Sequence, residues 1–333
     1  MSLLHSLTGG SDDLTSNDQE RHVSTVRIVA SVIICTHNPR SDYLRRCLDA
    51  LKDQTLPHDR WELIVVDNRS DEPLATRIDL SWHMAARLAR EEKLGKVPAS
   101  LRAIRESKGD LLVFVDDDNV LDRDFLETAL RVAEEKPFLG AWSGQCRPEF
   151  EQQPPEWTRR YWGNLVIREF DRDVWSNLPR LPETTPLGAG LCIRREAAVH
   201  YLSLHESGKR PFQLDRAGKS LLSGWDNDLA ACACDIGLGV GLISSLKLTH
   251  LMRSERLTED YLARLAEGIH YSGVLLDYLR GIRPAPRTTL GRVADFLRIM
   301  RLTRPHRRIL RAAFRGNSRA WQTIASMRRH EKD

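Results

Sequence analysis

Short, nearly continuous apolar runs, separated by segments with helical spacing, constrain the fold of this 333-residue chain most strongly. The first three runs cover residues 28–35, 62–66 and 111–115. Runs without polar alternation are typical of parallel strands covered on both faces. Leucines at helical spacing follow the first run, and we expect further helices over residues 80–92 and 99–108. This order of strands and helices predicts an α/β fold with a mostly parallel, doubly wound sheet flanked by helices.

The residues that follow these strands are the first candidates for a functional site, because ligands of doubly wound sheets bind beyond the carboxyl ends of the strands. The third strand ends in three adjacent acids, Asp116, Asp117 and Asp118. Adjacent carboxylates repel each other unless a cation neutralises them, and clustered oxygen ligands suit hard divalent ions such as Mg²⁺ or Mn²⁺. The alternative is a solvated acidic turn in which Asp118 caps a helix that begins near Leu121.

Two later segments carry polar residues that can act either in chemistry or in structure. Residues 224–229 read Gly-Trp-Asp-Asn-Asp-Leu and open a predicted helix. Capping of this helix would explain Asp226 or Asp228 without any catalytic role. His250 follows a predicted short strand, and a lone histidine is more often a structural residue than a metal ligand. Taken alone, these segments leave both interpretations open.

Composition and charge indicate a globular protein. Hydrophobic residues make up 41% of the chain and charged residues 29%, near globular averages. The net charge of +4 does not indicate a polyanion partner, so we expect no nucleic acid. Basic residues gather after Gly281, where helices could contact an anionic membrane or pack on the core with solvated arginines. The six cysteines lie mostly in apolar runs and no apolar stretch is long enough to span a membrane, so we predict a cytoplasmic protein, with peripheral membrane contact as a second hypothesis.

Five segments, in order along the chain, resemble motifs of family-2 glycosyltransferases with the GT-A fold. They are residues 31–38 (SVIICTHN), 63–70 (LIVVDNRS), 108–118 (KGDLLVFVDDD), 186–195 (PLGAGLCIRR) and 224–229 (GWDNDL). The resemblance covers residues 28–260 in outline. It implies a Rossmann-like enzyme that transfers a sugar, with inversion, from a nucleotide-diphosphate sugar to an acceptor hydroxyl. A UDP-sugar is the expected donor, and a cell-surface glycan or a lipid-linked saccharide is the expected acceptor, as in polysaccharide biosynthesis.

Carried over position by position, the resemblance implies a role for each site residue. Donor-binding residues would be Thr36, His37, Asn38, Asp67, Arg102, Asp116 and Asp117. Ligands of a divalent cation, Mn²⁺ or Mg²⁺, would be Asp116, Asp118 and His250, the catalytic base would be Asp226, and the acceptor side would include Gly188, Gly190 and Trp225. Two positions depart from the family pattern. Trp225 replaces the usual acid, and residues 99–101 replace the usual Ala-Arg-Asn, which leaves Arg102 as the substitute for a diphosphate-binding arginine.

These roles are chemically consistent with one another. An acceptor hydroxyl is a poor nucleophile at neutral pH, and a carboxylate that takes its proton accelerates attack by about 10²–10⁴-fold. A divalent cation can neutralise the charge that develops on the leaving nucleoside diphosphate. Direct displacement inverts the anomeric centre and needs no protein nucleophile.

The organisation along the chain follows from the same pattern. We expect a flexible arm over residues 1–26, a catalytic domain over 27–257 and a basic helical region over 258–333. Within the catalytic domain, residues 27–120 would bind the nucleotide sugar and residues 121–257 the acceptor. One alternative is a sugar nucleotidyltransferase, although its glycine-rich phosphate loop is absent after the first strand. The other is a non-catalytic protein that binds anionic lipid or nucleic acid.

Overall fold

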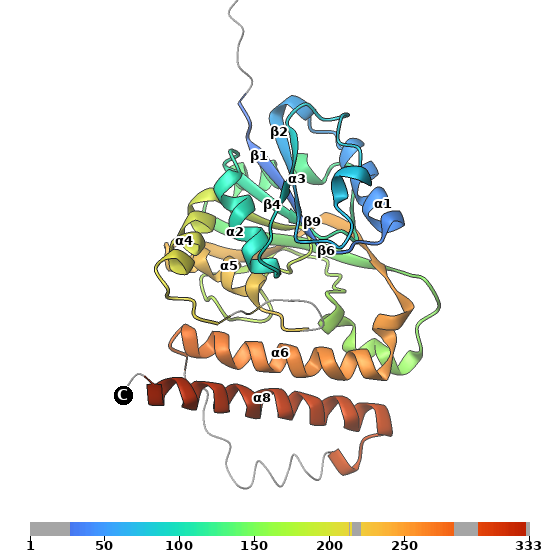
Figure 1. Ribbon diagram of the computed structural model, residues 1–333, viewed down its shortest axis with the longest axis vertical. Helices are drawn as coiled ribbons and strands as arrows, with labels where there is room; N and C mark the ends of the chain where they lie inside the picture. Colours follow the sequence, from blue (N-terminus) through green and yellow to red (C-terminus); the bar gives the residue numbers. More distant parts are fainter. Residues whose placement is uncertain (1–26, 213, 215–220, 283–298, 331–333) are drawn as a thin grey trace, which may run out of the picture.

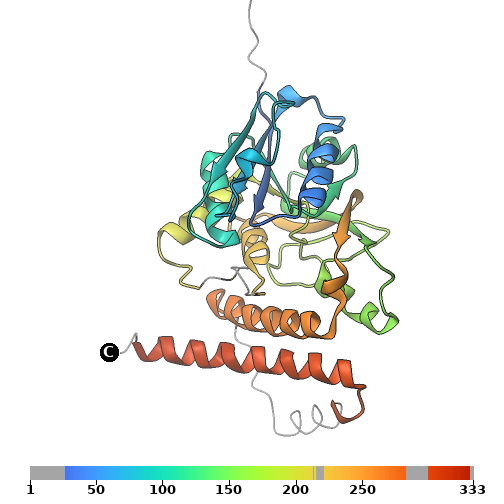
Figure 2. The same cartoon turned by 45° about the vertical axis from the view of Figure 1, so that its right-hand side comes forward.

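A computed structural model describes residues 27–212, 214, 221–282 and 299–330 (Figure 1). The predicted N-terminal arm, residues 1–26, lies outside the described residues, as do parts of the basic C-terminal region. One sheet carries helices on both faces, and two long helices, α6 and α8, lie side by side beneath it (Figures 1 and 2). The architecture is α/β, as predicted.

The N-terminal half of the sheet is parallel. Its order is β3-β2-β1-β4, formed by β1 (Ala30–Thr36), β2 (Trp61–Asp67), β3 (Ala86–Arg90) and β4 (Leu111–Val115). Every residue of β1, β2 and β4 is buried, because successive side chains point to opposite faces and both faces are covered. In β1, for example, Val32 packs in one hydrophobic cluster and Ile33 in another. The prediction of three buried parallel strands is confirmed.

The helix predicted over residues 80–92 is wrong. Residues 86–90 form β3, which pairs in parallel with β2 at the edge of the sheet. Alanine, leucine, arginine and glutamate in this stretch favour a helix locally, but pairing with a neighbouring strand overrides that preference. Two ion pairs join β3 to β2: Arg87 with Glu62 at 2.7 Å and Arg90 with Asp67 at 2.9 Å. The helix predicted over residues 99–108 is confirmed as α2 (Lys96–Glu106).

The second half of the sheet is mixed. It continues from β4 through β8 (Leu191–Arg194), β6 (Leu139–Phe150), β9 (Gly239–Met252) and β5 (Asn119–Leu121), and β7 (Val174–Ser176) also pairs with β9. Strand β8 runs antiparallel to β4 and β6, and β5 and β7 run antiparallel to β9. Between β4 and β8 the chain passes through other strands, so no single crossover helix imposes a parallel direction. The predicted parallel sheet thus carries an antiparallel addition that the sequence pattern did not indicate.

Helices cover both faces of the sheet. Helices α1 (Ser41–Lys52) and α3 (Phe125–Glu135) share a hydrophobic cluster with one face. Helices α2, α4 (Arg195–Glu206) and α5 (Trp225–Asp235) share a cluster with the other face. Short 3₁₀ turns connect these elements at η1 (His58–Arg60), η2 (Leu74–Thr76), η3 (Glu156–Leu165) and η4 (Ser254–Leu257). The first turns of α2 and α5 lie at the carboxyl ends of the parallel strands, where a site is expected.

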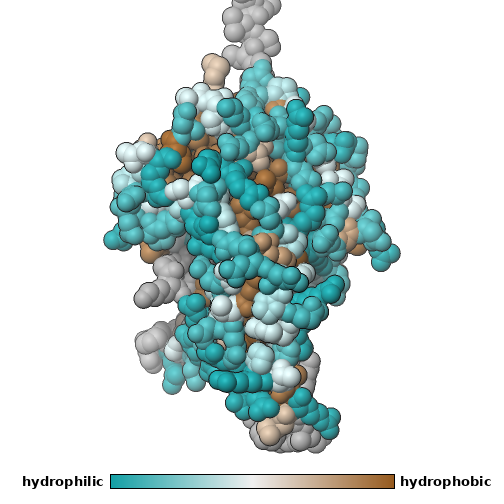
Figure 3. Space-filling view, turned by 90° about the vertical axis from the view of Figure 1, so that its right-hand side faces the viewer, coloured by the Kyte–Doolittle hydropathy of each residue, from teal (hydrophilic) through white to brown (hydrophobic). Residues whose placement is uncertain are grey.

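Two long helices form the C-terminal part of the described chain. Helices α6 (Glu259–Leu279) and α8 (Arg304–His330) run in the same direction, because Arg308 pairs with Glu259 and Arg315 with Glu267 in the same order along both. Gly316 permits their close approach, since a Cβ there would lie 2.2 Å from the carbonyl oxygen of Glu267. The predicted helical extension is confirmed for these segments. None of the described helices combines the length and the apolarity needed to cross a bilayer, and hydrophilic residues predominate on the face shown in Figure 3.

Candidate active site

A cavity of about 290 Å³ lies beyond the carboxyl ends of the parallel strands, where the sequence predicted a site. The loops after β1, β2 and β4 contribute to its wall, together with the first turns of α2 and α5. We call it the acidic cavity. The predicted site residues that it brings together are Thr36, His37, Asp116, Asp117, Gly188, Trp225 and Asp226.

Asp117, which follows β4, is close to other polar and acidic side chains. Asp117 accepts a hydrogen bond from the hydroxyl of Thr36, the last residue of β1. Burial, together with the neighbouring Asp118, raises the pKa of the Asp117 carboxyl to about 6. Both effects penalise the charged form of the acid, so the acidic cavity favours a bound cation.

Lys96 is a cavity residue that sequence analysis missed. It begins α2, and its ammonium donates to Asp116 at 2.7 Å and to the carbonyl oxygen of Cys35 at 3.0 Å. Burial alone would lower the pKa of Lys96, but Asp116, Cys35 and Asp117 together outweigh this effect and raise the pKa above its usual value. Lys96 was not recognised because strand β3, which precedes it, was predicted as part of a helix. With β3 assigned, Lys96 would have stood shortly after the carboxyl end of a parallel strand, where ligand-binding residues are expected.

Asp118 lies next to the acidic cavity but is not among the residues that line it. Antiparallel pairing of β5 with β9 sets Asn119 opposite His250 and leaves the Asp118 carboxylate 3.4 Å from His250 Nε2. A guanidinium nitrogen of Arg256 lies 2.8 Å from the same carboxylate oxygen. Helix α3 begins only at Phe125, so Asp118 does not cap it, and that alternative is wrong.

Asp118 and His250 are a pair of side chains that a divalent cation can bind. Neighbouring ligand atoms of an octahedral Mg²⁺ site are about 3 Å apart, close to the separation of Asp118 and His250. Both side chains are buried, and His250 Nδ1 has no hydrogen-bond partner among the described residues. Asp116, the third predicted ligand, is bound by Lys96, and among the described residues it does not form a compact group of ligand atoms with Asp118 and His250. The nearby guanidinium of Arg256 was not predicted.

Asp226 lies in the first turn of α5, with its carboxylate against Gly188. A Cβ at position 188 would lie 2.5 Å from Asp226 Oδ2, so a larger residue there would push the carboxylate away. The other oxygen, Oδ1, accepts a hydrogen bond from the backbone N–H of Asn227 at 2.9 Å. Glycine at position 188 is therefore a requirement for the place that Asp226 occupies.

A second cavity, of about 380 Å³, adjoins the first at Asp226. We call it the arginine groove because Arg168 and Arg180 line it, and helix α6 also contributes to its wall. The residues that line both cavities are Val166, Gly188, Ser223 and Asp226. Val166 adopts a φ of +65°, a strained conformation for a β-branched residue and one of the kind that concentrates at functional sites.

The second acid of α5, Asp228, has a structural environment. Its side chain is 3% exposed and is bound by Arg210 at 2.6 Å and by Arg280 at 2.7 Å. A buried carboxylate between two guanidinium groups is fully engaged in holding α5 to the end of α6. Of the two acids, Asp226 lines the cavities and Asp228 lines neither.

Comparison with known proteins agrees with this geometry. Residues 31–187 match the sequence model of Glycosyl transferase family 2. The chain contains a family 2 glycosyltransferase domain. Its fold is similar to that of the mannosyltransferase PcManGT from Pyrobaculum calidifontis, solved in complex with GDP-Man and Mn²⁺, with a TM-score of 0.51. The two chains are 19% identical, and the similarity covers 91% of this chain and 75% of the other. The predicted GT-A fold is confirmed.

Two relatives are similar to the chain in sequence over shorter stretches. The chain is 31% identical over 100 residues to glycosyltransferase AglE of Haloferax volcanii, which covers 29% of this chain and 33% of AglE. It is 29% identical over 122 residues to the putative teichuronic acid biosynthesis glycosyltransferase TuaG of Bacillus subtilis, which covers 35% of this chain and 46% of TuaG. The matched region thus spans a third of one relative and somewhat under half of the other.

Several residues predicted for the family 2 site line neither cavity. Besides Asp118 and His250, these residues are Asn38, Asp67, Arg102 and Gly190. Asp67 accepts hydrogen bonds from the backbone of Ser70 and from Arg90, so its oxygens shape the loop after β2. Arg102 donates to Glu106 and to the carbonyl oxygen of Arg90. We therefore no longer expect Arg102 to hold the diphosphate, and Lys96, which contacts Asp116, is the cation that lines the acidic cavity.

The other two have comparable local roles. Asn38 exchanges hydrogen bonds with Asp71, joining the loops after β1 and β2. Gly190 has a φ of +65°, and a Cβ there would lie 2.7 Å from Leu248, so glycine is needed for packing. These residues support the family 2 site from outside the cavities.

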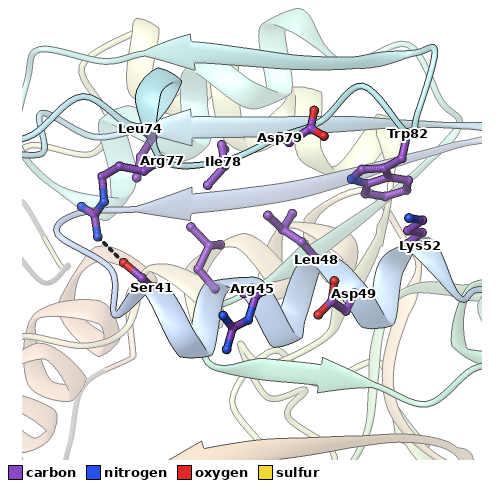
Figure 4. A pocket seen from close by; sticks show the side chains of 11 residues that line it. Ser41, Arg45, Leu48, Asp49, Lys52, Leu74, Arg77, Ile78, Asp79 and Trp82 are labelled. Carbon is purple, nitrogen blue, oxygen red and sulfur yellow. Dashed lines mark hydrogen bonds between the residues drawn. The ribbon is translucent and has the colours of Figure 1, made fainter.

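A third hollow of about 380 Å³ lies between α1 and the segment 74–82 (Figure 4). Leu48 of α1 points toward the segment that carries Ile78 and Trp82 (Figure 4). It contains no predicted site residue and none from the carboxyl ends of the parallel strands. We assign it no role in the family 2 site.

Proposed function

We propose that the chain is an inverting glycosyltransferase that transfers a sugar from a nucleotide-diphosphate sugar to an acceptor hydroxyl. The observation that carries the proposal is the place of Asp226, which lines both the acidic cavity and the arginine groove. A base that takes the proton of an attacking hydroxyl must reach the point where the two substrates meet. The match to family 2 supports transfer of a sugar, and two cavities that meet at Asp226 would leave room for a donor and an acceptor.

The donor would lie in the acidic cavity. Thr36 ends β1, and His37 and Asn68 directly follow β1 and β2, at the edge where doubly wound sheets bind nucleotides. Lys96 stands at the amino end of α2, where a cation and helix amides favour phosphate. A divalent cation held by Asp116, Asp118 and His250 would neutralise charge on the leaving diphosphate. Since UDP is the most frequent nucleotide in the family, we expect a UDP-sugar.

The acceptor hydroxyl would enter from the arginine groove. Its oxygen forms a bond to the anomeric carbon while the bond from that carbon to the diphosphate oxygen breaks, and Asp226 takes the hydroxyl proton. Attack opposite the leaving group inverts the anomeric centre. No protein nucleophile takes part in this single displacement.

The arginine groove suits an acceptor that carries a phosphate or carboxylate group. Arg180 is paired with Asp277 at 2.7 Å, so its charge is compensated. Arg168 donates only to the carbonyl oxygens of Pro182 and Glu183 in the hydrogen bonds identified, and neutral acceptors orient a guanidinium without neutralising it. A glycan with acidic groups or a lipid-linked saccharide would meet this requirement.

The basic C-terminal helices give little support to membrane contact. On α8, Arg308 pairs with Glu259 and Asp260, and Arg315 and Arg319 both pair with Glu267. These arginines are therefore directed to α6, as expected for a helical cap packed on the core. Peripheral membrane contact and a cytoplasmic location stay predictions from the sequence.

Two measurements test the proposed function. The first is thermal unfolding with UDP, GDP and ADP, each with and without Mn²⁺, where a glycosyltransferase should be stabilised by one nucleoside diphosphate. The second identifies the product released from the matching nucleotide sugar in the presence of saccharide acceptors. Release of a nucleoside diphosphate supports glycosyl transfer. Release of pyrophosphate from a nucleoside triphosphate and a sugar phosphate would instead establish the nucleotidyltransferase alternative.

A further inference from the structure

We propose that Arg256 is a built-in counter-cation of the acids that follow β4. Its guanidinium holds the Asp118 carboxylate and the His250 imidazole until a divalent cation displaces it. The inference rests on the metal site of the proposed function and adds a residue that competes for that site. Arg256 belongs to η4, the turn that joins β9 to α6. Its place in the sequence gives no sign of this role.

The guanidinium of Arg256 contacts both predicted ligands at once. One terminal nitrogen lies 2.8 Å from Asp118 Oδ2, and the other lies 3.0 Å from His250 Nε2. The side chains involved are 17% exposed for Arg256, 8% for Asp118 and 7% for His250. A planar guanidinium presents parallel donors, so it can bind two neighbouring acceptors in a fixed geometry.

These contacts engage the atoms that a metal ion would need. A guanidinium has donors and no acceptor, so in this contact His250 Nε2 accepts the hydrogen bond with its lone pair. The ring proton then resides on Nδ1, which is buried and has no hydrogen-bond partner among the described residues. A metal bound at Nε2 requires the same lone pair and the same tautomer. Arg256 therefore keeps His250 in the form suited to a metal while blocking its ligand atom.

The same contact explains how Asp118 can be buried before a metal binds. A carboxylate removed from water is strongly destabilising unless a positive charge compensates it. Arg256 supplies one positive charge to Asp118, and Lys96 supplies another to Asp116. A divalent cation at Asp118 and Arg256 in its present position would place like charges side by side, so the two occupy the site alternately.

The test uses Mn²⁺ alone, without nucleotide, and the full-length protein. Binding is measured by titration with electron paramagnetic resonance detection of free Mn²⁺, and thermal unfolding is recorded with Mn²⁺ or with a chelator. Arg256→Gln should bind Mn²⁺ at least about tenfold more tightly than wild type, because no hydrogen bonds to charged and buried groups need to be broken first. It should also gain more thermal stability from Mn²⁺ than wild type does.

Arg253→Gln is the matched control. Arg253 precedes the same turn and carries the same charge, but its ion-pair partner is Glu255 at 3.5 Å. Its Mn²⁺ affinity should stay within about twofold of wild type, since Arg253 makes none of the identified contacts with Asp118 or His250 and its side chain is partly exposed to screening by solvent. Arg256→Lys keeps the charge but loses the two-pronged contact, and its affinity should lie between those of wild type and Arg256→Gln.

Equal or weaker Mn²⁺ binding by Arg256→Gln than by wild type would overturn the proposal. An equal gain in Mn²⁺ affinity by Arg253→Gln would also overturn it, because removal of any positive charge from this turn would then have the same effect. Absence of Mn²⁺ binding by both wild type and Arg256→Gln, with the proteins folded, would overturn it as well. Nucleotide binding is measured separately, so a protein that binds Mn²⁺ as expected but no nucleotide would contradict the proposed function and leave the role of Arg256 intact.

Discussion

Replacement of Gly188 by alanine should impair transfer by moving one carboxylate. A Cβ at this position would lie 2.5 Å from Asp226 Oδ2, 3.1 Å from its Cβ and 3.2 Å from its Cγ. Oδ2 must retreat by about 0.9 Å to regain an ordinary contact of 3.4 Å. Misplacement of a reacting group by about 1 Å can reduce the rate about 10²-fold. We therefore expect the transfer rate of Gly188→Ala at saturating donor to fall by about that factor.

The assay compares sugar transfer with nucleotide affinity in the same preparation. Donor affinity should change by less than about tenfold, because Lys96, Thr36 and the acids keep their contacts. Overpacking should lower the free energy of unfolding by about 1–3 kcal/mol. Gly163→Ala is the control, since Gly163, like Gly188, lines the arginine groove, but a Cβ at position 163 meets nothing within 4 Å. Normal transfer by a folded Gly188→Ala variant, or an equal loss in Gly163→Ala, would refute the reasoning.

Three further outcomes follow from the described contacts. Asp228→Asn should lower the free energy of unfolding in urea by about 3–5 kcal/mol, because the buried Arg210 loses its ion-pair partner and the buried Arg280 keeps only Asp235, while transfer per folded molecule stays near normal. Lys96→Met should weaken binding of the nucleoside diphosphate at least about tenfold in calorimetry, since it removes the cation that faces Asp116 and the expected phosphates. Burial, with His58 nearby, lowers the pKa of His83 to about 4. The stability that neutral His83 contributes is therefore complete above its unfolded pKa near 6.5 and is lost as the pH falls toward 4. A His83→Phe variant should lose less stability than wild type on acidification, by about 2–3 kcal/mol between pH 7 and 4.

The buried parallel strands could be predicted because a strand buried on both faces has a nearly continuous run of apolar residues. Strands β1, β2 and β4 consist almost entirely of apolar residues, and this pattern alone placed the acids of β4 at the edge of the sheet. Strand β3 shows no such pattern, because it lies at the edge of the sheet, is partly exposed, and carries arginines that pair with acids of β2. Its omission also concealed Lys96, which follows it.

Other site residues depend on contacts between distant parts of the chain. Arg256 reaches Asp118 because β9 pairs with β5, and neither strand's partner can be read from local composition. To distinguish the role of Asp226 from that of Asp228 likewise requires the positions of Arg210 and Arg280, which bind Asp228. The motif predicted that an acid of α5 would be functional, whereas tertiary packing shows which acid lines the cavities.

The most direct test of the account is the transfer rate of Asp226→Asn at saturating donor, measured together with its affinity for the nucleoside diphosphate. Asparagine has nearly the same size and can keep the contact with the Asn227 backbone, but it cannot take a proton from the acceptor. We predict a fall in transfer of at least about 10²-fold, with nucleotide affinity within a few-fold of wild type. Near-normal transfer by Asp226→Asn would contradict the assignment of Asp226 as the base at the junction of the two cavities.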